Sequence, residues 1–172
     1  MDVHRFYNRL FAPVIAEFGP FDSETIAGII GFDGGGPVTM MTIGRSRREQ
    51  IVTYVTCELA VRNDQVASDV GTHELLVRCD DEVWARKILT KAGQMSIDVG
   101  FGHGHTLDIG PWVGEEAAIQ GLAFELYSHC RIDQHEHGVL RVHGLTRGEL
   151  VNAQEKGVDA VLALRRTRGE SV

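Results

Sequence analysis

The sequence lacks the cysteines that hold many small proteins together. Its 172 residues include only three cysteines, and these, Cys57, Cys79 and Cys130, are isolated and odd in number. A disulfide framework or a zinc site of paired cysteines needs closer, even spacing. Each cysteine lies in an apolar, strand-like run, where a free thiol behaves as a small buried hydrophobe. We therefore expect neither a disulfide scaffold nor redox chemistry.

Long apolar runs and an excess of positive charge are also missing. The longest apolar stretch, from Ile26 to Phe32, is far shorter than the roughly 20 residues of a membrane-spanning helix. The first residues lack the basic-then-apolar layout of a signal peptide, so we expect a cytoplasmic protein that binds no membrane. The net charge of −7 disfavours nucleic-acid binding, which depends on clustered cations. It suits a partner with a basic surface.

The composition that remains is typical of a folded domain. Hydrophobic residues make up 43% of the chain and charged residues 24%, close to the globular average. A chain of this length fits one domain, and the sequence shows no repeat, linker or low-complexity segment. We predict a single domain over residues 1–172 of the α+β class. Its expected architecture is a sandwich in which a mixed β-sheet packs against helices.

Hydrophobic periodicity places helices at the two ends of the chain. The apolar face from Phe6 to Phe18 predicts an N-terminal helix, and Pro13 should kink or break it. The acidic run Asp80–Glu82 predicts the start of a further helix, because carboxylates favour helix N-termini. Alternating or continuous apolar residues predict strands at 26–32, 38–44, 51–61, 75–79, 106–109, 122–126 and 139–143, with turns at 33–37 and 133–138.

The clearest local signal lies near the end of the chain. Thr146 and Glu149 have the spacing of a capping box, in which each residue satisfies a backbone N–H group of the other at a helix start. Gly157 fits the left-handed residue that ends such a helix. Residues 158–164 continue as a second helical segment. The sequence therefore predicts a pair of C-terminal helices.

The eight histidines are the first candidates for chemistry. His103/His105 and His135/His137 each form a His-x-His pair, which on a strand places both imidazole rings on one face, as a metal site requires. The carboxylate that would complete such a motif after His105 is missing, because Ile109 and Gly110 stand there. The second pair is expected in a turn. We expect exposed loop histidines, no cofactor and no metal; a small metal-dependent enzyme that uses both pairs is the alternative.

Motifs for covalent catalysis are absent from the sequence. No Gly-x-Ser-x-Gly elbow occurs, and Ser46 is expected at a hairpin tip, where a base and an oxyanion hole are hard to assemble. The residues alone indicate an acidic α+β domain with no catalytic constellation. A housekeeping domain that binds a small ligand therefore stays as a second alternative.

The order of several segments resembles the suppressor of fused (SUFU) domain family. The resemblance covers residues 38–166 and depends on the order and spacing of its motifs. Trp84 is similar to the residue that opens a helix in the family. The other similar segments are Met40–Ser46, Glu74–Val77, Gly104–Leu107, Gly138–Leu140, Gly144–Thr146 and Glu149–Leu150, followed by Gly157 and Leu162.

The resemblance implies a non-enzymatic protein-binding module. The chain is similar to bacterial stand-alone members of the family, which look like immunity proteins that neutralise the toxins of neighbouring cells. The implied partner is another protein, such as a basic toxin domain. In one respect the chain departs from the family pattern, because Arg45 replaces a leucine and Arg47 stands where an acidic residue is common.

Three residues are candidates for contact with such a partner. Ser46 and Arg47 should lie at an exposed tip between two strands. Trp112 follows Pro111 in an expected loop. Aromatic and arginine side chains most often anchor protein interfaces, so we expect Ser46, Arg47 and Trp112 to contribute to partner binding.

Overall fold

The computed structural model of the chain describes residues 2–31, 37–43 and 51–168, apart from the side chains of residues 23–25. The expected turn residues 33–36 and the strand-end tip that carries Ser46 and Arg47 lie outside these ranges. The helices are α1 (Val3–Leu10), α2 (Ala12–Phe18), α3 (Glu82–Met95), α4 (Gly110–Val113), α5 (Arg147–Lys156) and α6 (Val158–Thr167). The strands are β1 (Phe21–Ile30), β2 (Val38–Ile43), β3 (Val52–Cys57), β4 (Thr72–Cys79), β5 (Thr106–Asp108), β6 (Gly121–Ile132) and β7 (His135–Leu145).

The described strands form one mixed sheet in the order β1-β2-β3-β4-β7-β6-β5. The pairs β1–β2, β2–β3, β3–β4 and β5–β6 are antiparallel, whereas β4 and β7 are parallel. The α+β class and the pair of C-terminal helices are therefore as predicted. By their contacts the residues divide into two compact units, Met1–Phe101 with Leu126–Arg141, and Gly102–Glu125 with Val142–Val172. We call them unit 1 and unit 2.

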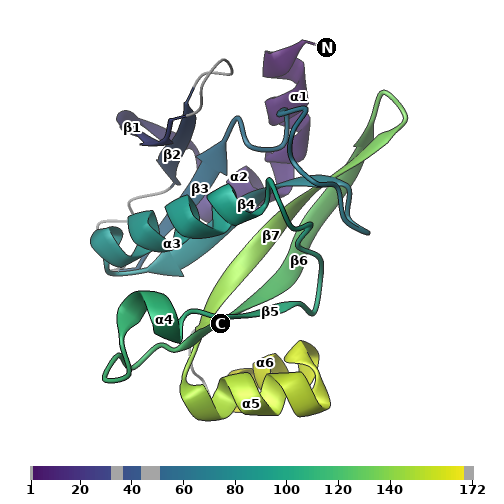
Figure 1. Cartoon of the computed structure of the whole chain (residues 1–172). Helices are drawn as coiled ribbons and strands as arrows, with labels where there is room; N and C mark the ends of the chain where they lie inside the picture. The colour runs from purple at the N-terminus through teal and green to yellow at the C-terminus, as the bar shows by residue number, and fades with distance from the viewer. Residues whose placement is uncertain (1, 32–36, 44–50, 169–172) are drawn as a thin grey trace. The chain divides into compact units, whose positions relative to one another are not determined.

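In unit 1, helices cover both faces of the sheet (Figure 1). The apolar face of α1 and α2, which Pro13 divides as expected, packs on one side. Its core comprises Phe6, Leu10, Phe11, Val14, Ile43, Val55, Cys57, Leu76 and Val139. On the other side α3 packs against β1, β3 and β4, and Asp81 caps its first turn by accepting a hydrogen bond from the N–H group of Trp84. Because both faces are covered, β3 is buried along nearly its whole length.

Unit 2 has its own core, built by the C-terminal helices. The buried residues are Ala123, Leu145, Leu150, Ala153, Val158, Val161 and Leu162. The capping box is present as predicted: the Thr146 side chain accepts from the N–H group of Glu149, and the Glu149 carboxylate accepts from the N–H group of Thr146. At Gly121 a Cβ atom would lie only 2.8 Å from a methyl carbon of Leu150. A glycine in β6 thus lets α5 approach the strand.

The predicted position of the first strand was wrong. It runs from Phe21 to Ile30, and the side chain of Ile26 is 55% exposed, whereas the expectation was a buried strand from Ile26 to Phe32. The reason is its position, because β1 is the outermost strand of the sheet. An apolar run at a sheet edge has the same pattern as one in the centre, so the pattern alone does not separate the two.

The hairpin of β6 and β7 is longer than predicted. Its turn consists of Asp133 and Gln134 alone, which have φ angles of 48° and 70°. Two residues with positive φ are typical of a tight hairpin turn, which usually contains Asn-Gly or Asp-Gly. Without that glycine the sequence did not show the turn. His135 and His137 therefore lie in β7, and their expected place in a turn was wrong.

Gly157 joins the two C-terminal helices in a conformation that differs from the predicted one. Its φ of 89° is positive, as expected, but its ψ of 152° is extended rather than left-handed helical. The chain therefore leaves α5 and starts α6 at once. Positive φ still favours glycine at this position.

The capping box should make a measurable contribution to stability. Replacing Thr146 by Ala removes the acceptor of the Glu149 N–H group, and we expect a loss of about 1 kcal/mol in the free energy of unfolding. Urea denaturation measures this loss. Thr146→Ser keeps the hydroxyl and should unfold close to the wild type. Equal stability of the Ala and Ser variants would show that the cap contributes nothing.

Candidate functional site

Of the three predicted contact residues, the structure describes only Trp112. Ser46 and Arg47 lie outside the described residues. Trp112 is described, but it lies in the short helix α4 rather than in a loop, and it is half-buried. Pro111 fits this helix start, because its fixed φ suits the first positions of a helix. The expected loop at Trp112 was therefore wrong, whereas its role in binding stays a prediction.

A hollow of about 660 Å³ lies beside α4 in unit 2, and Asp108, Pro111, Glu115, Gln120 and Arg147 line it. Arg147 and Asp108 form an ion pair. The Arg147 guanidinium, with the Gly110 N–H group, holds the pKa of Asp108 below its usual range. The Gln120 side-chain amide donates to three backbone carbonyls of the loop after α4. These groups hold each other in place, and the arrangement offers no nucleophile beside a base.

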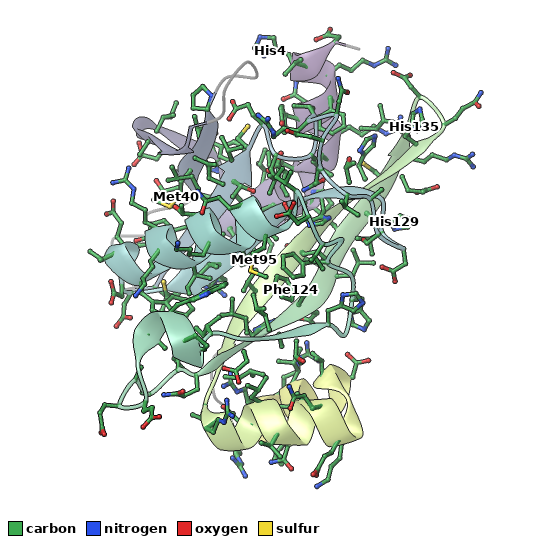
Figure 2. All side chains as sticks on the ribbon, viewed as in Figure 1. His4, Met40, Met95, Phe124, His129 and His135 are labelled. Atoms are coloured by element: carbon green, nitrogen blue, oxygen red, sulfur yellow. The ribbon has the colours of Figure 1, made fainter. Side chains whose placement is uncertain are left out.

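The histidine pairs do not form a metal site within the described part of the chain, where no three His, Cys, Asp or Glu side chains are close enough to hold an ion. His103 lies 3.3 Å from the Asp159 carboxylate. His105 Nδ1 accepts a hydrogen bond from the Gly102 N–H group. Figure 2 shows His135 near the end of the β6–β7 hairpin. The metal-dependent alternative thus finds no support in this geometry.

His137 is fixed by groups of unit 1. Its Nδ1 lies 2.8 Å from the Thr72 hydroxyl, which donates to the Ala60 carbonyl. The Nδ1 therefore donates to Thr72, because the only proton of that hydroxyl is already used. The Phe6 ring meets the imidazole edge-on at 4.8 Å. Burial lowers the pKa of His137. These contacts make His137 a packing residue between α1 and the sheet.

The most unusual group of the molecule is the carboxyl of Glu74. It is 0% exposed and lies on β4, where sequence reasoning treated it only as part of a similar segment. Its Oε1 accepts from the Tyr7 hydroxyl at 3.1 Å and from the Ala60 N–H group at 2.9 Å. Its Oε2 accepts from the Thr56 hydroxyl at 2.6 Å. Donors from α1, from β3 and from the segment after β3 thus converge on one carboxyl group.

The same network holds two backbone irregularities. The Leu75 N–H group donates to the Thr56 hydroxyl, just beyond the last ladder pair Val55–Leu76. Glu58, which follows β3, has a φ of 76°, a conformation that is strained for a residue with a side chain. The Tyr7 hydroxyl accepts a hydrogen bond from the Glu58 N–H group at 2.7 Å. The ends of β3 and β4 therefore depend on the polar cluster around Glu74.

Burial governs the charge of this carboxyl. The loss of water raises the pKa of Glu74 from 4.5 to about 8, although the bonds from Thr56, Ala60 and Tyr7 oppose the shift. Near pH 7 the carboxyl is therefore mostly neutral. A raised pKa can mark a catalytic acid, but such an acid must reach a substrate. A side chain that is 0% exposed does not, so the arrangement serves the fold.

Unit 2 contains a second group of carboxylates, and these stay charged. The Glu125 carboxylate accepts from His143 at 2.9 Å and from Arg166 at 2.6 Å, and these donors lower its pKa to about 2. Glu149 accepts two bonds from Arg165, at 2.7 and 2.6 Å, which together with the cap lower its pKa to about 2. Both carboxylates hold α6 in place through their arginine partners.

Comparison with known proteins identifies the fold. No protein-family model matches the sequence, and no curated protein matches it. Solved structures do match: the Sufu–Fu complex has a TM-score of 0.65 at 13% identity, over 95% of this chain and 83% of the other. A SUFU (suppressor of fused protein) homolog from Neisseria gonorrhoeae has 0.62 at 16%, over 97% and 92%. Drosophila Suppressor of Fused has 0.55 at 14%, over 78% and 39%.

The protein is therefore an α+β protein with a suppressor-of-fused-like fold. This confirms the fold that the segment order indicated. At these identities the likeness concerns the fold alone. Among the described residues, no helix is long and apolar enough to cross a membrane.

The charge state of Glu74 should appear in the pH dependence of stability. Because its pKa is raised to about 8, the folded state binds the proton more tightly than the unfolded chain. Its contribution to stability is fully present below about pH 4.5 and is lost as the pH rises to about 8. The slope is about 1.4 kcal/mol per pH unit. Urea denaturation between pH 5 and 9 measures it.

Two variants separate this effect from the other titrating groups. Glu74→Gln is neutral at every pH and should lose the slope. Glu155→Gln changes an exposed residue of α5 and should keep it. Burial lowers the pKa of His73 to about 4, which gives a slope of opposite sign below about pH 6.5. The comparison is therefore between variants at each pH. A Glu74→Gln protein that keeps the wild-type slope would contradict the buried neutral carboxyl.

Removal of metal should leave the protein unchanged. We expect the same Tm before and after prolonged dialysis against a strong chelator, because the described His, Cys, Asp and Glu residues form no cluster of three. A metal that binds only the folded state would add its binding energy to stability. A fall of Tm on dialysis that zinc restores would therefore overturn this expectation.

Proposed function

We propose that the protein is a non-enzymatic, protein-binding module. The observation that carries this proposal is the likeness of its fold to the suppressor of fused structures, among them one of Sufu in complex with Fu. The internal chemistry agrees, because Glu74, whose pKa is raised as that of a catalytic acid can be, is sealed from solvent. The surface hollow beside α4 contains an ion pair and a loop-fixing amide, neither of which performs catalysis.

We further propose that the partner is a toxin with a basic surface and that the protein neutralises it in the bacterial cytoplasm. The net charge of −7 supports this proposal, because opposite potentials steer association and suppress wrong partners. An immunity protein needs no chemistry of its own. It needs a stable scaffold, which the two covered cores provide.

Ser46, Arg47 and Trp112 are the proposed contact residues. A partner purified with the protein from its native cells should bind at least about tenfold more weakly to Trp112→Ala and to Arg47→Glu, measured by calorimetry. Arg86→Glu, an equivalent charge reversal on α3, is the control and should bind like the wild type. Equal binding by all three variants would place the contact elsewhere.

A growth assay tests neutralisation itself. Cells that express the partner alone should stop growing, and co-expression of this chain should restore growth. The proposal would be overturned if no protein partner is recovered while the purified chain hydrolyses a generic ester or phosphate substrate.

A further inference from the structure

A pocket of about 430 Å³ opens in unit 1 at the end of the β6–β7 hairpin. One wall consists of the segment after β3 and the start of β4, and it includes Val61, Arg62 and Thr72. The other wall is the end of the hairpin, which includes Ile132, Asp133 and His137. Pockets that bind ligands have volumes of about 300–1,000 Å³, so this one is large enough to take a long side chain.

Backbone contacts hold the two walls together. Thr72 pairs with His137 in the parallel ladder of β4 and β7. Gly71, which precedes β4, has a φ of 77°, and a Cβ atom at this position would overlap the carbonyl oxygen of Glu136. Glycine permits this close approach of the two chain segments. The pocket is therefore formed by the backbone of the fold before any partner binds.

His137 contributes a hydrogen-bond acceptor to this pocket, in addition to its packing on Phe6. Its side chain is only 8% exposed, and burial lowers its pKa, so the ring is neutral near pH 7. Because Nδ1 donates its proton to the Thr72 hydroxyl, Nε2 carries a lone pair. No donor to Nε2 is found among the residues that the structure describes. A nearly buried acceptor without a donor is costly, so a donor from a ligand would stabilise it.

Asp133 contributes the unpaired charge. It lies in the hairpin turn, is exposed and forms no ion pair with any described residue. Its negative charge acts on the His137 imidazole, so the carboxylate and the ring lie close to each other. The pocket thus presents two acceptors of different kinds, a carboxylate and an imidazole nitrogen.

The other charges around the pocket are compensated. Arg62 donates two hydrogen bonds of 2.8 Å to the Asp64 carboxylate. Glu136 lies 3.7 Å from the guanidinium of Arg131. His135, which also lines the pocket, counts as neutral in the formal charge at pH 7. One negative charge therefore remains, and it matches a single cation from a partner.

The shape and chemistry of the pocket favour arginine as that cation. Val61 and Ile132 provide apolar surface beside the two acceptors, and arginine can bury its stem on such surface while its charged group reaches a polar one. The guanidinium has five N–H donors in a fixed plane and can serve two acceptors at once. The ammonium group of lysine is more strongly hydrated and therefore loses more on entering a partly buried pocket.

We propose that this pocket receives an arginine side chain of a basic protein partner. The guanidinium donates hydrogen bonds to the Asp133 carboxylate and to His137 Nε2, and the stem packs on Val61 and Ile132. This inference rests on the proposed protein-binding function and agrees with the basic partner proposed there. It adds a contact surface to the three contact residues of that proposal.

The probe is the peptide Gly-Arg-Gly with both ends blocked, and the matched peptide has citrulline, the uncharged isostere of arginine. Titration of the 15N-labelled protein, followed by NMR of the backbone amides, should show saturable binding of the arginine peptide, with shifts concentrated in residues 60–72 and 132–137. The citrulline peptide should bind about tenfold more weakly or less, because a hydrogen bond between two charged groups is lost. Equal binding of the two peptides would overturn the proposal.

Two variants locate the binding surface. Asp133→Asn removes the charge, and asparagine tolerates the positive φ of this position, so the turn should persist. This variant should bind the arginine peptide about tenfold more weakly. Asp98→Asn removes an exposed carboxylate after α3, outside the pocket, and should bind within about twofold of the wild type. Thermal melts confirm that both variants are folded. Equal losses in the two variants would contradict the assignment.

The ring nitrogens of His137 give a direct readout of the second contact. On saturation with the arginine peptide, the 15N signal of Nε2 should move because this atom gains a donor, and the signal of Nδ1 should stay near its position in the free protein. An unchanged Nε2 signal would show that His137 does not contact the guanidinium. If a partner purified from native cells binds Asp133→Asn as tightly as the wild type, this pocket is wrong as the contact, whereas the protein-binding function stands.

Discussion

A fully buried carboxyl group organises unit 1. Glu74 takes donors from Tyr7, Thr56 and Ala60, so helix α1, strand β3 and the segment after it are tied to the centre of the sheet. No cation is among these donors. Burying an unpaired carboxylate is costly, and a protein avoids that cost by keeping the group neutral. The raised pKa of Glu74 is the direct consequence.

Unit 2 is held by the opposite solution, in which the carboxylates stay charged. Glu149 is both the N3 residue of the capping box and the acceptor of the hydrogen bonds from Arg165. Glu125 joins β6 to α6 through Arg166. These pairs are partly exposed, so water still solvates their charges and the cost of burial is small. Glu74 in unit 1 and Glu125 and Glu149 in unit 2 thus all stabilise the fold.

Sequence reasoning succeeded where the signal is local. The capping box at Thr146, the helix start at Asp81 and the break at Pro13 each depend on residues within one helical turn. It failed at the β6–β7 turn because Asp133 and Gln134 adopt positive φ without a glycine. It failed at Trp112 because a helix of four residues is too short to show a periodic pattern.

The polar centre was missed for a different reason. Glu74 stands beside three apolar residues, Leu75, Leu76 and Val77, and a charged residue in such a run is a visible signal of burial with partners. The partners themselves are not visible, because Tyr7 lies 67 positions away in the sequence and Thr56 lies 18 away. Only the fold brings them together. The segment Glu74–Val77 resembles the SUFU family, but that resemblance did not show the role of Glu74 in the fold.

The fold of unit 1 depends on a neutral, buried carboxyl at Glu74, and NMR of its side-chain carboxyl carbon measures that charge state directly. With 13C-labelled glutamate, the carboxyl signal that disappears in Glu74→Gln should titrate near pH 8, as the raised pKa requires. Titration near pH 4.5 would show a solvated carboxylate. That result would contradict the buried, neutral Glu74 carboxyl in the centre of unit 1.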